Sequence, residues 1–256
     1  KRGLAKKAFR TAHIREEWNR GKFTSLLKPI FIDRAFPQGL DGEIAVSEAL
    51  RGYLLERRPG KIDPAKVHRF YNAIDLAKIE EDAQSEPELL ADLETAAFTL
   101  VSVGRLAEQK GYPYLIEAIR RLKDRIPGLR LLVLGDGEDR EALRELSDEA
   151  GLSEAIRFMG LVPQGQVPAI LKKADLFVLA SLWEGLPTVV LEAMAVKTPV
   201  VATAIPGTVE LVEDGVTGRL VAPRDPAALA DAIESAWKDP EARQRWTHEA
   251  YRRLSQ

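Results

Sequence analysis

Cysteine is absent from this chain of 256 residues, and histidine occurs only three times. The absence of cysteine excludes disulfides, cysteine-based zinc sites and thiol nucleophiles, and it is compatible with a reducing compartment. The histidines, His13, His68 and His248, are too scattered in the sequence to form a metal-ligand motif. We therefore expect a cytoplasmic protein that uses neither cysteine chemistry nor a histidine-bound metal.

Long apolar runs and a large net charge are also missing. The longest apolar run, from Ala174 to Trp183, is interrupted by Asp175 and falls far short of the roughly 20 residues that span a bilayer. The 37 Lys and Arg residues nearly balance 39 Asp and Glu, which disfavours a dedicated nucleic-acid binder. With 45% hydrophobic residues, the composition is that of a soluble globular protein with one or two domains.

Positive charge is concentrated at the start of the chain. Residues 1–28 hold nine Lys or Arg against two acids, a surplus of seven. Two interpretations remain open: a solvated basic surface, or peripheral contact with an anionic partner such as the cytoplasmic face of a membrane.

The first third of the sequence predicts short elements. Strands are expected at residues 8–14, 43–46 and 67–71, and helices over most of 16–36 and from the cap Ser47 to Leu55. The polar stretch from Asp75 to Glu94 predicts short helices around a connection between domains.

From Phe98 onward, apolar strands alternate with amphipathic helices. Strands are expected at 98–103, 129–134, 156–159, 176–179, 200–203 and 218–221, and helices at 113–125, 139–150, 167–174, 188–196, 226–237 and 241–254. The strands have few polar interruptions, as in a parallel sheet buried on both faces. The pattern predicts an α/β, Rossmann-like domain that binds its ligand at the carboxyl ends of the strands.

The first of these strand ends carries two cations. Arg105 and Lys110 share the loop that begins at Gly104 and precedes a helix. A guanidinium fork, an ammonium and a helix N-terminus together suit a diphosphate, although a pair of solvated surface cations is the plain alternative.

A second loop carries two carboxylates. Glu184 precedes the tight turn Gly185-Leu186-Pro187, Thr188 is expected to cap the next helix, and Glu192 lies one turn inside that helix. Paired carboxylates normally suggest glycoside hydrolysis. The two cations favour a sugar transferase instead, because such an enzyme must neutralise a departing nucleoside diphosphate.

Taken together, these motifs resemble family-4 retaining glycosyltransferases of the GT-B fold. The resemblance covers about residues 98–233, and five motifs agree with the family in order and spacing. They are Gly104-Arg105-Leu106 with Lys110-Gly111, the segment 132–137, the segment 157–160, Glu184 with Glu192 inside 191–195, and Gly215 with 218–221.

The resemblance implies roles for individual residues. Arg105 and Lys110, with Gly104, match the diphosphate-binding loop, and Glu192 matches the carboxylate that holds the donor ribose. Glu184 and His13 match groups near the transferred sugar and are the catalytic candidates. The remaining donor contacts implied are the backbone of Gly185, Leu186, Pro187 and Thr188, and a nucleobase contact near Phe158, Met159 and Gly160.

The sequence departs from the family pattern at two places. Residues 206–210 lack the usual Gly-Gly, so we carry over no contacts of that loop. Only the last part of the N-terminal, acceptor-side domain is represented, over residues 1–75. We expect a complete donor domain over 76–237 and a final helix, within 238–256, that packs back toward the N-terminal part.

The sequence therefore predicts a retaining glycosyltransferase that transfers a sugar from a nucleotide-diphosphate-sugar donor to an acceptor hydroxyl. The acceptor is expected to be a sugar, a lipid-linked sugar or a small molecule. No metal and no cofactor besides the donor substrate are expected, and no nucleic acid is an expected partner. A GT-B nucleotide-sugar epimerase and a non-catalytic nucleotide-sugar-binding fragment are the alternatives.

Overall fold

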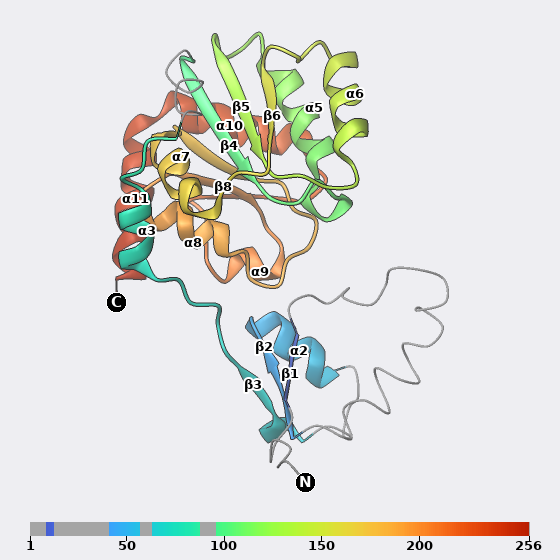
Figure 1. Ribbon diagram of the computed structural model, residues 1–256, viewed down its shortest axis with the longest axis vertical. Helices are drawn as coiled ribbons and strands as arrows, with labels where there is room; N and C mark the ends of the chain where they lie inside the picture. Colours follow the sequence, from blue (N-terminus) through green and yellow to red (C-terminus); the bar gives the residue numbers. More distant parts are fainter. Residues whose placement is uncertain (1–8, 13–40, 57–62, 88–95, 256) are drawn as a thin grey trace. The chain divides into compact units, whose positions relative to one another are not determined.

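The computed structural model describes residues 9–12, 41–56, 63–87 and 96–255 (Figure 1). The chain forms two compact units: unit 1 contains residues 1–73 and 184–186, and unit 2 contains residues 74–183 and 187–256. His13, the expected helix over 16–36 and most of the basic segment 1–28 lie outside the described residues.

Unit 1 contains a parallel sheet of three short strands. Strands β1 (Phe9–Ala12), β2 (Gly42–Ala45) and β3 (Val67–Arg69) pair in that order, and a short 3-10 turn η3 (Pro64–Lys66) precedes β3. Helix α2 (Glu48–Glu56) follows β2, and the Ser47 hydroxyl accepts a hydrogen bond from the backbone N–H of Leu50 at 3.2 Å. The predicted cap is confirmed, while β3 ends two residues before the expected Tyr71.

Unit 2 contains a sheet of six parallel strands in the order β6-β5-β4-β7-β8-β9. The strands are β4 (Phe98–Val103), β5 (Leu129–Leu134), β6 (Ile156–Gly160), β7 (Leu176–Leu179), β8 (Val200–Thr203) and β9 (Arg219–Val221). This strand order is that of a Rossmann-like domain. The predicted α/β fold is confirmed, with strand limits that differ from the expected ones by one residue at most.

Helices cover both faces of this sheet (Figure 1). Helices α5 (Tyr112–Leu122), α6 (Arg140–Glu149) and α10 (Pro226–Lys238) lie on one face. Helices α7 (Val167–Lys173) and α8 (Thr188–Ala195) lie on the other, with α3 (Leu76–Asp82) packed against them. The short helix α9 (Pro206–Val209) and the 3-10 turns η5 (Glu108–Lys110) and η6 (Gln164–Gln166) were not predicted from the sequence.

Burial on both faces explains the continuous apolar strands. In β5, Leu131 and Val133 belong to the core that includes α5 and α10, whereas Leu132 and Leu134 belong to the core that includes α7 and α8. Successive side chains of a strand point to opposite faces, so a strand covered on both sides needs apolar residues at every position.

The final helix α11 (Pro240–Leu254) belongs to unit 2 and contributes to both layers. Trp246 packs into the core beside α10, and Ala250 packs into the core beside α8. Its expected packing toward the N-terminal part stays a prediction, as do the expected domain limits. Among the described residues, no helix is long and apolar enough to cross a bilayer.

Candidate functional site

The strand order of unit 2 places a topological switch point beside β4. Strand β5 pairs with one side of β4 and β7 pairs with the other, so the connections that follow β4 and β7 lead in opposite directions. In open α/β sheets, ligands bind at this point, outside the carboxyl ends of the strands. The two loops predicted from the sequence follow these two strands.

The loop after β4 places Lys110 against the strand end. A methyl group added to Gly104 would stand 2.8 Å from Lys110 Cε, so the lysine side chain occupies the space that glycine leaves open. The hydroxyl of the buried Tyr112 donates to the Gly104 carbonyl at 3.3 Å. Lys110 is thereby held half-buried at the carboxyl end of the central strand.

Arg105 lies on the same loop and is more exposed. Its Nε donates to Glu138 Oε2 at 2.9 Å, and both side chains are about half exposed to solvent. Glu138 follows β5, so the guanidinium faces the neighbouring strand end. An exposed ion pair contributes only about 0–1 kcal/mol, so a ligand phosphate can compete with Glu138 for the guanidinium.

The loops at these strand ends pack closely on one another. Gly135 has a φ of +137°, and a side chain there would overlap the Gly104 carbonyl. Gly111 has a φ of +62°, and a side chain there would overlap the Ala180 carbonyl. Glycine is required at both positions because of the backbone conformation and the close approach. Gln109 adds two hydrogen bonds between the loops that follow β4 and β7.

Helix α8 begins at the end of the loop that follows β7. Thr188 is its first residue and Pro187 its N-cap, without a side-chain cap hydrogen bond. The expectation that Thr188 caps the helix is therefore wrong, because the cap position falls on a proline, which has no side-chain acceptor. The first backbone N–H groups of a helix lack intrahelical acceptors and carry partial positive charge, which favours an anionic ligand.

Glu192 lies in the second turn of α8 and is half-buried. Burial raises the pKa of its carboxyl group above the ordinary value of 4.5. Glu184 is half-buried in the loop between β7 and α8 and belongs to unit 1 together with Gly185 and Leu186. The expected convergence of Glu184 and Glu192 on one ligand stays a prediction.

The end of β6 carries the residues expected near the nucleobase. Phe158 packs against the core on one face of the sheet and Met159 against the core on the other. Gly160 is buried, and its carbonyl accepts a hydrogen bond from Gly135 N at 2.8 Å. The nucleobase contact itself stays a prediction. Leu161, which the sequence did not single out, follows directly with 81% of its surface exposed.

Three further residues of the site were also missed from the sequence. Gln109, Tyr112 and Glu138 act through contacts between loops, for which no pattern in the sequence gives a signal. His13 lies outside the described residues. Among the residues that the structure describes, no three His, Cys, Asp or Glu side chains form a group that could hold a metal ion.

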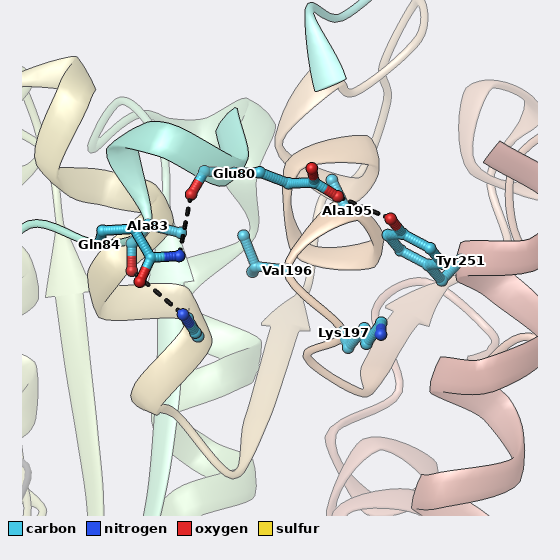
Figure 2. A pocket seen from close by; sticks show the side chains of 8 residues that line it. Glu80, Ala83, Gln84, Ala195, Val196, Lys197 and Tyr251 are labelled. Carbon is cyan, nitrogen blue, oxygen red and sulfur yellow. Dashed lines mark hydrogen bonds between the residues drawn. The ribbon is translucent and has the colours of Figure 1, made fainter. Parts of the chain in front are cut away.

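A separate hollow of about 280 Å³ lies at the other end of α8 (Figure 2). It is lined by Glu80, Ala83, Gln84, Lys172, Ala195, Val196, Lys197 and Tyr251. Tyr251 Oη donates to Glu80 Oε1 at 2.6 Å, which raises the pKa of the phenol, and the Lys197 ammonium lies 4.5 Å from the Tyr251 ring centre. Lysines at helix C-termini balance the negative end of the helix dipole, so we interpret the hollow as a structural junction of α3, α8 and α11.

Comparison with known proteins assigns a family to this architecture. Residues 91–253, which include most of unit 2, match the model of the family described as Glycosyl transferases group 1. The chain belongs to this glycosyltransferase family. The Rossmann-like sheet and the paired loops at its switch point are therefore those of a glycosyltransferase domain.

Individual relatives of this glycosyltransferase chain are also glycosyltransferases. It is 34% identical to alpha-D-kanosaminyltransferase of Streptomyces kanamyceticus over 197 residues, which cover 76% of this chain and 51% of that protein. The lipopolysaccharide core biosynthesis glycosyltransferase LpsE of Rhizobium meliloti is 35% identical over 182 residues, 71% of this chain and 48% of that protein. The chain thus spans about half the length of these curated relatives.

Solved structures show the same GT-B fold. The sucrose-phosphate synthase of Thermosynechococcus elongatus matches with a TM-score of 0.79 and 25% identity, over 96% of this chain and 62% of that one. HepE of Anabaena, in complex with UDP and glucose, matches with a TM-score of 0.76 and 24% identity, over 85% of this chain and 59% of that one. At that level of identity, the HepE likeness shows the fold alone.

Proposed function

We propose that this chain binds a nucleotide-diphosphate sugar and transfers the sugar to an acceptor hydroxyl with retention of the anomeric configuration. One observation carries the proposal: Lys110, Arg105 and the N-terminus of α8 lie on loops that flank the switch point of the sheet. Three sources of positive charge beside one switch point suit a diphosphate better than a neutral sugar.

The chemistry proposed for these groups is electrostatic. Breaking the bond between sugar and diphosphate leaves negative charge on the departing phosphate, which Arg105, Lys110 and the α8 N-terminus stabilise. Glu192 accepts hydrogen bonds from the ribose hydroxyls, and Glu184 with His13 orients the sugar. Because the protein cations neutralise the leaving group, we propose that transfer needs no divalent metal.

The donor and the stereochemistry follow from the relatives and from the family resemblance. HepE of Anabaena was also solved in complex with UDP-glucose, at 25% identity over 85% of this chain, which supports a nucleotide sugar as the donor here. Retention follows from the resemblance to family-4 enzymes. Proton NMR of the first product distinguishes retention from inversion, and turnover in the presence of a chelator tests the independence from metal.

The direct test is calorimetric titration of the chain with UDP, GDP and ADP. We expect one of them to bind, and Arg105→Ala and Lys110→Ala each to weaken its binding about tenfold or more, because each removes a charge-assisted hydrogen bond to the diphosphate. Lys123→Ala is the matched control, because this exposed lysine follows the far end of α5. Equal affinity in all four proteins would overturn the site assignment.

A further inference from the structure

We propose that Gln109 is a positioning residue that sets the geometry of the sugar-binding loop; the inference rests on the proposed function. Gln109 bonds to the loop after β7 through both its backbone and its side chain. Its carbonyl accepts from Leu182 N at 2.7 Å, and its side-chain amide Nε2 donates to the Trp183 carbonyl at 2.9 Å. One residue thus holds two peptide groups of this loop, the one between residues 181 and 182 and the one between residues 183 and 184.

The position of Gln109 in its own loop is rigid. It is the middle residue of the 3-10 turn η5, in which Lys110 N donates to the Ala107 carbonyl and Gly111 N donates to the Glu108 carbonyl, at 2.9 and 3.0 Å. The turn ends at Gly111, whose close approach to the Ala180 carbonyl fixes the distance between the two loops. The backbone that carries the Gln109 side-chain amide is therefore held in one position.

The second hydrogen bond acts on the residues that follow Trp183. The Trp183 carbonyl belongs to the same planar peptide unit as the N–H of Glu184, so holding this carbonyl sets the direction in which the chain enters the loop 184–187. Glu184, the first residue of this loop, is proposed to orient the sugar. The cations proposed to bind the diphosphate lie instead on the loop of Gln109 itself.

Because the sugar and the diphosphate contact different loops, we expect the loss of the Gln109 amide to weaken the binding of the sugar and to leave the binding of the diphosphate unchanged. Without the Gln109 amide, the loop that begins at Glu184 loses one hydrogen bond. The contacts that position Arg105, Lys110 and the α8 N-terminus stay in place. We therefore expect the loss to appear in the affinity for the nucleotide sugar, compared with the nucleoside diphosphate that carries the same base.

Gln109→Glu is the decisive variant. It keeps the size of the side chain but replaces a donor with a carboxylate that only accepts, which then faces the Trp183 carbonyl. Glu108→Gln is the matched control: it exchanges the same two groups at the adjacent, exposed position. Gln109→Met removes the donor without adding charge and serves if Gln109→Glu fails to fold, as judged by circular dichroism.

Two measurements on the whole chain test the inference. The first is hydrogen exchange of peptides covering residues 180–187 in the absence of ligand, which we expect to accelerate in the Gln109 variants and to remain at the wild-type rate in Glu108→Gln. The second is calorimetric titration with UDP, GDP and ADP and with the glucose ester of whichever of them binds. In the Gln109 variants we expect wild-type affinity for the nucleoside diphosphate and about tenfold weaker binding of its sugar ester.

The outcomes separate the two proposals. If the wild-type chain binds none of the three nucleotides and none of their glucose esters, the proposed function fails, whatever the exchange rates show. If the wild-type chain binds them and the Gln109 variants match it in exchange and in both affinities, the positioning role is overturned and the function stands. If the Gln109 variants lose the same amount of affinity for the nucleoside diphosphate and for its sugar ester, the positioning role is also overturned, because Gln109 would then act on the diphosphate.

Discussion

Glu192 is the residue at which stability and ligand binding conflict. Its carboxyl group is half-buried, and burial raises its pKa because a buried charge loses hydration. At neutral pH, the ionised form therefore costs free energy of folding. The same ionised form is the acceptor that the ribose hydroxyls would need. Carboxyl groups whose pKa values are shifted by burial are concentrated at functional sites.

Glu192→Gln should therefore act in opposite directions on the two properties. We expect its midpoint of thermal unfolding without ligand to exceed that of the wild type, and its affinity for the nucleotide to fall about 10- to 100-fold, because a hydrogen bond to a charged acceptor is lost. Differential scanning fluorimetry and calorimetric titration measure the two effects. Glu145→Gln, on the exposed face of α6, is the control; a variant with unchanged affinity would remove Glu192 from the site.

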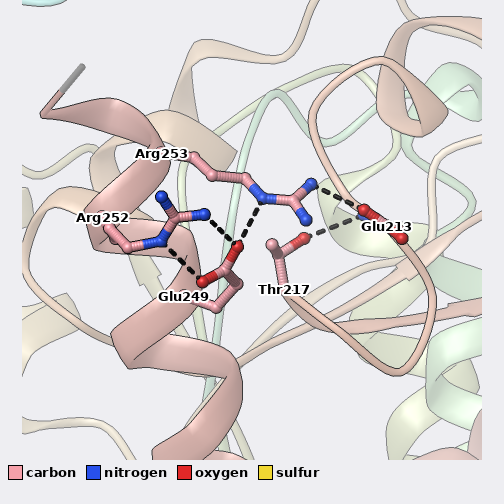
Figure 3. Close-up of polar contacts among 5 residues, drawn as sticks. All are labelled: Glu213, Thr217, Glu249, Arg252 and Arg253. Atoms are coloured by element: carbon pink, nitrogen blue, oxygen red, sulfur yellow. Dashed lines mark hydrogen bonds and ion pairs between the residues drawn. The ribbon is translucent and has the colours of Figure 1, made fainter.

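Helix α11 is linked to another part of unit 2 by a network of ion pairs and hydrogen bonds (Figure 3). Glu249 accepts hydrogen bonds from Arg252 and from Arg253, at 2.7 to 2.9 Å, and these lower the pKa of Glu249 to about 2. Arg253 also forms an ion pair with Glu213 at 2.7 Å. The backbone N–H of Glu213 donates a hydrogen bond to the Thr217 hydroxyl. The network links the last turn of the helix to the loop before β9.

The lowered pKa of Glu249 predicts a loss of stability in acid. A carboxylate with a depressed pKa in the folded state stabilises the protein above the unfolded pKa of about 4.5, and this contribution disappears as the pH falls from there toward 2. We expect Glu249→Gln to lower the unfolding midpoint at pH 7 and to differ less from the wild type at pH 2.5. Thermal unfolding monitored across this range measures the difference, with the exposed Glu241→Gln as control; a constant difference would contradict the prediction.

At the scale of the whole molecule, unit 2 has the features of an independent domain. Both of its hydrophobic cores are formed by residues between Phe98 and Leu254, from all six strands and the helices on the two faces. The residues proposed to hold the diphosphate and the ribose also lie within this unit. A domain that contains its own core can fold alone.

A fragment of residues 74–256 should therefore fold and bind the nucleotide. We expect a single cooperative unfolding transition in urea and the same Kd for the nucleoside diphosphate as the whole chain shows. Sugar transfer should be lost, because His13 is absent from the fragment. Circular dichroism, calorimetry and a product assay measure these three properties, and a fragment that folds but does not bind would show that unit 1 contributes to the donor site.

Some residues of the candidate site could be predicted from the sequence, and others could not. Arg105, Lys110 and Glu192 were predicted because motifs near expected strand ends contain them, and parallel strands place their carboxyl ends along one edge; their roles stay predictions. Gln109 was not found, since its partners lie more than 70 residues away and a hydrogen bond to a backbone carbonyl selects no residue type there. The capping role expected for Thr188 was wrong, because the helix begins at Thr188 itself, one residue earlier than a cap at that position requires.

The alternation of strands and helices in unit 2 could be predicted from the amino-acid sequence, because burial on both faces of a parallel sheet requires the apolar runs that it contains. The strand order β6-β5-β4-β7-β8-β9, and with it which loops meet, was revealed by the folded structure. That order depends on packing between segments far apart in the chain, which no local pattern encodes. The same packing brings the loops of Arg105 and Trp183 together across the hydrogen bonds of Gln109.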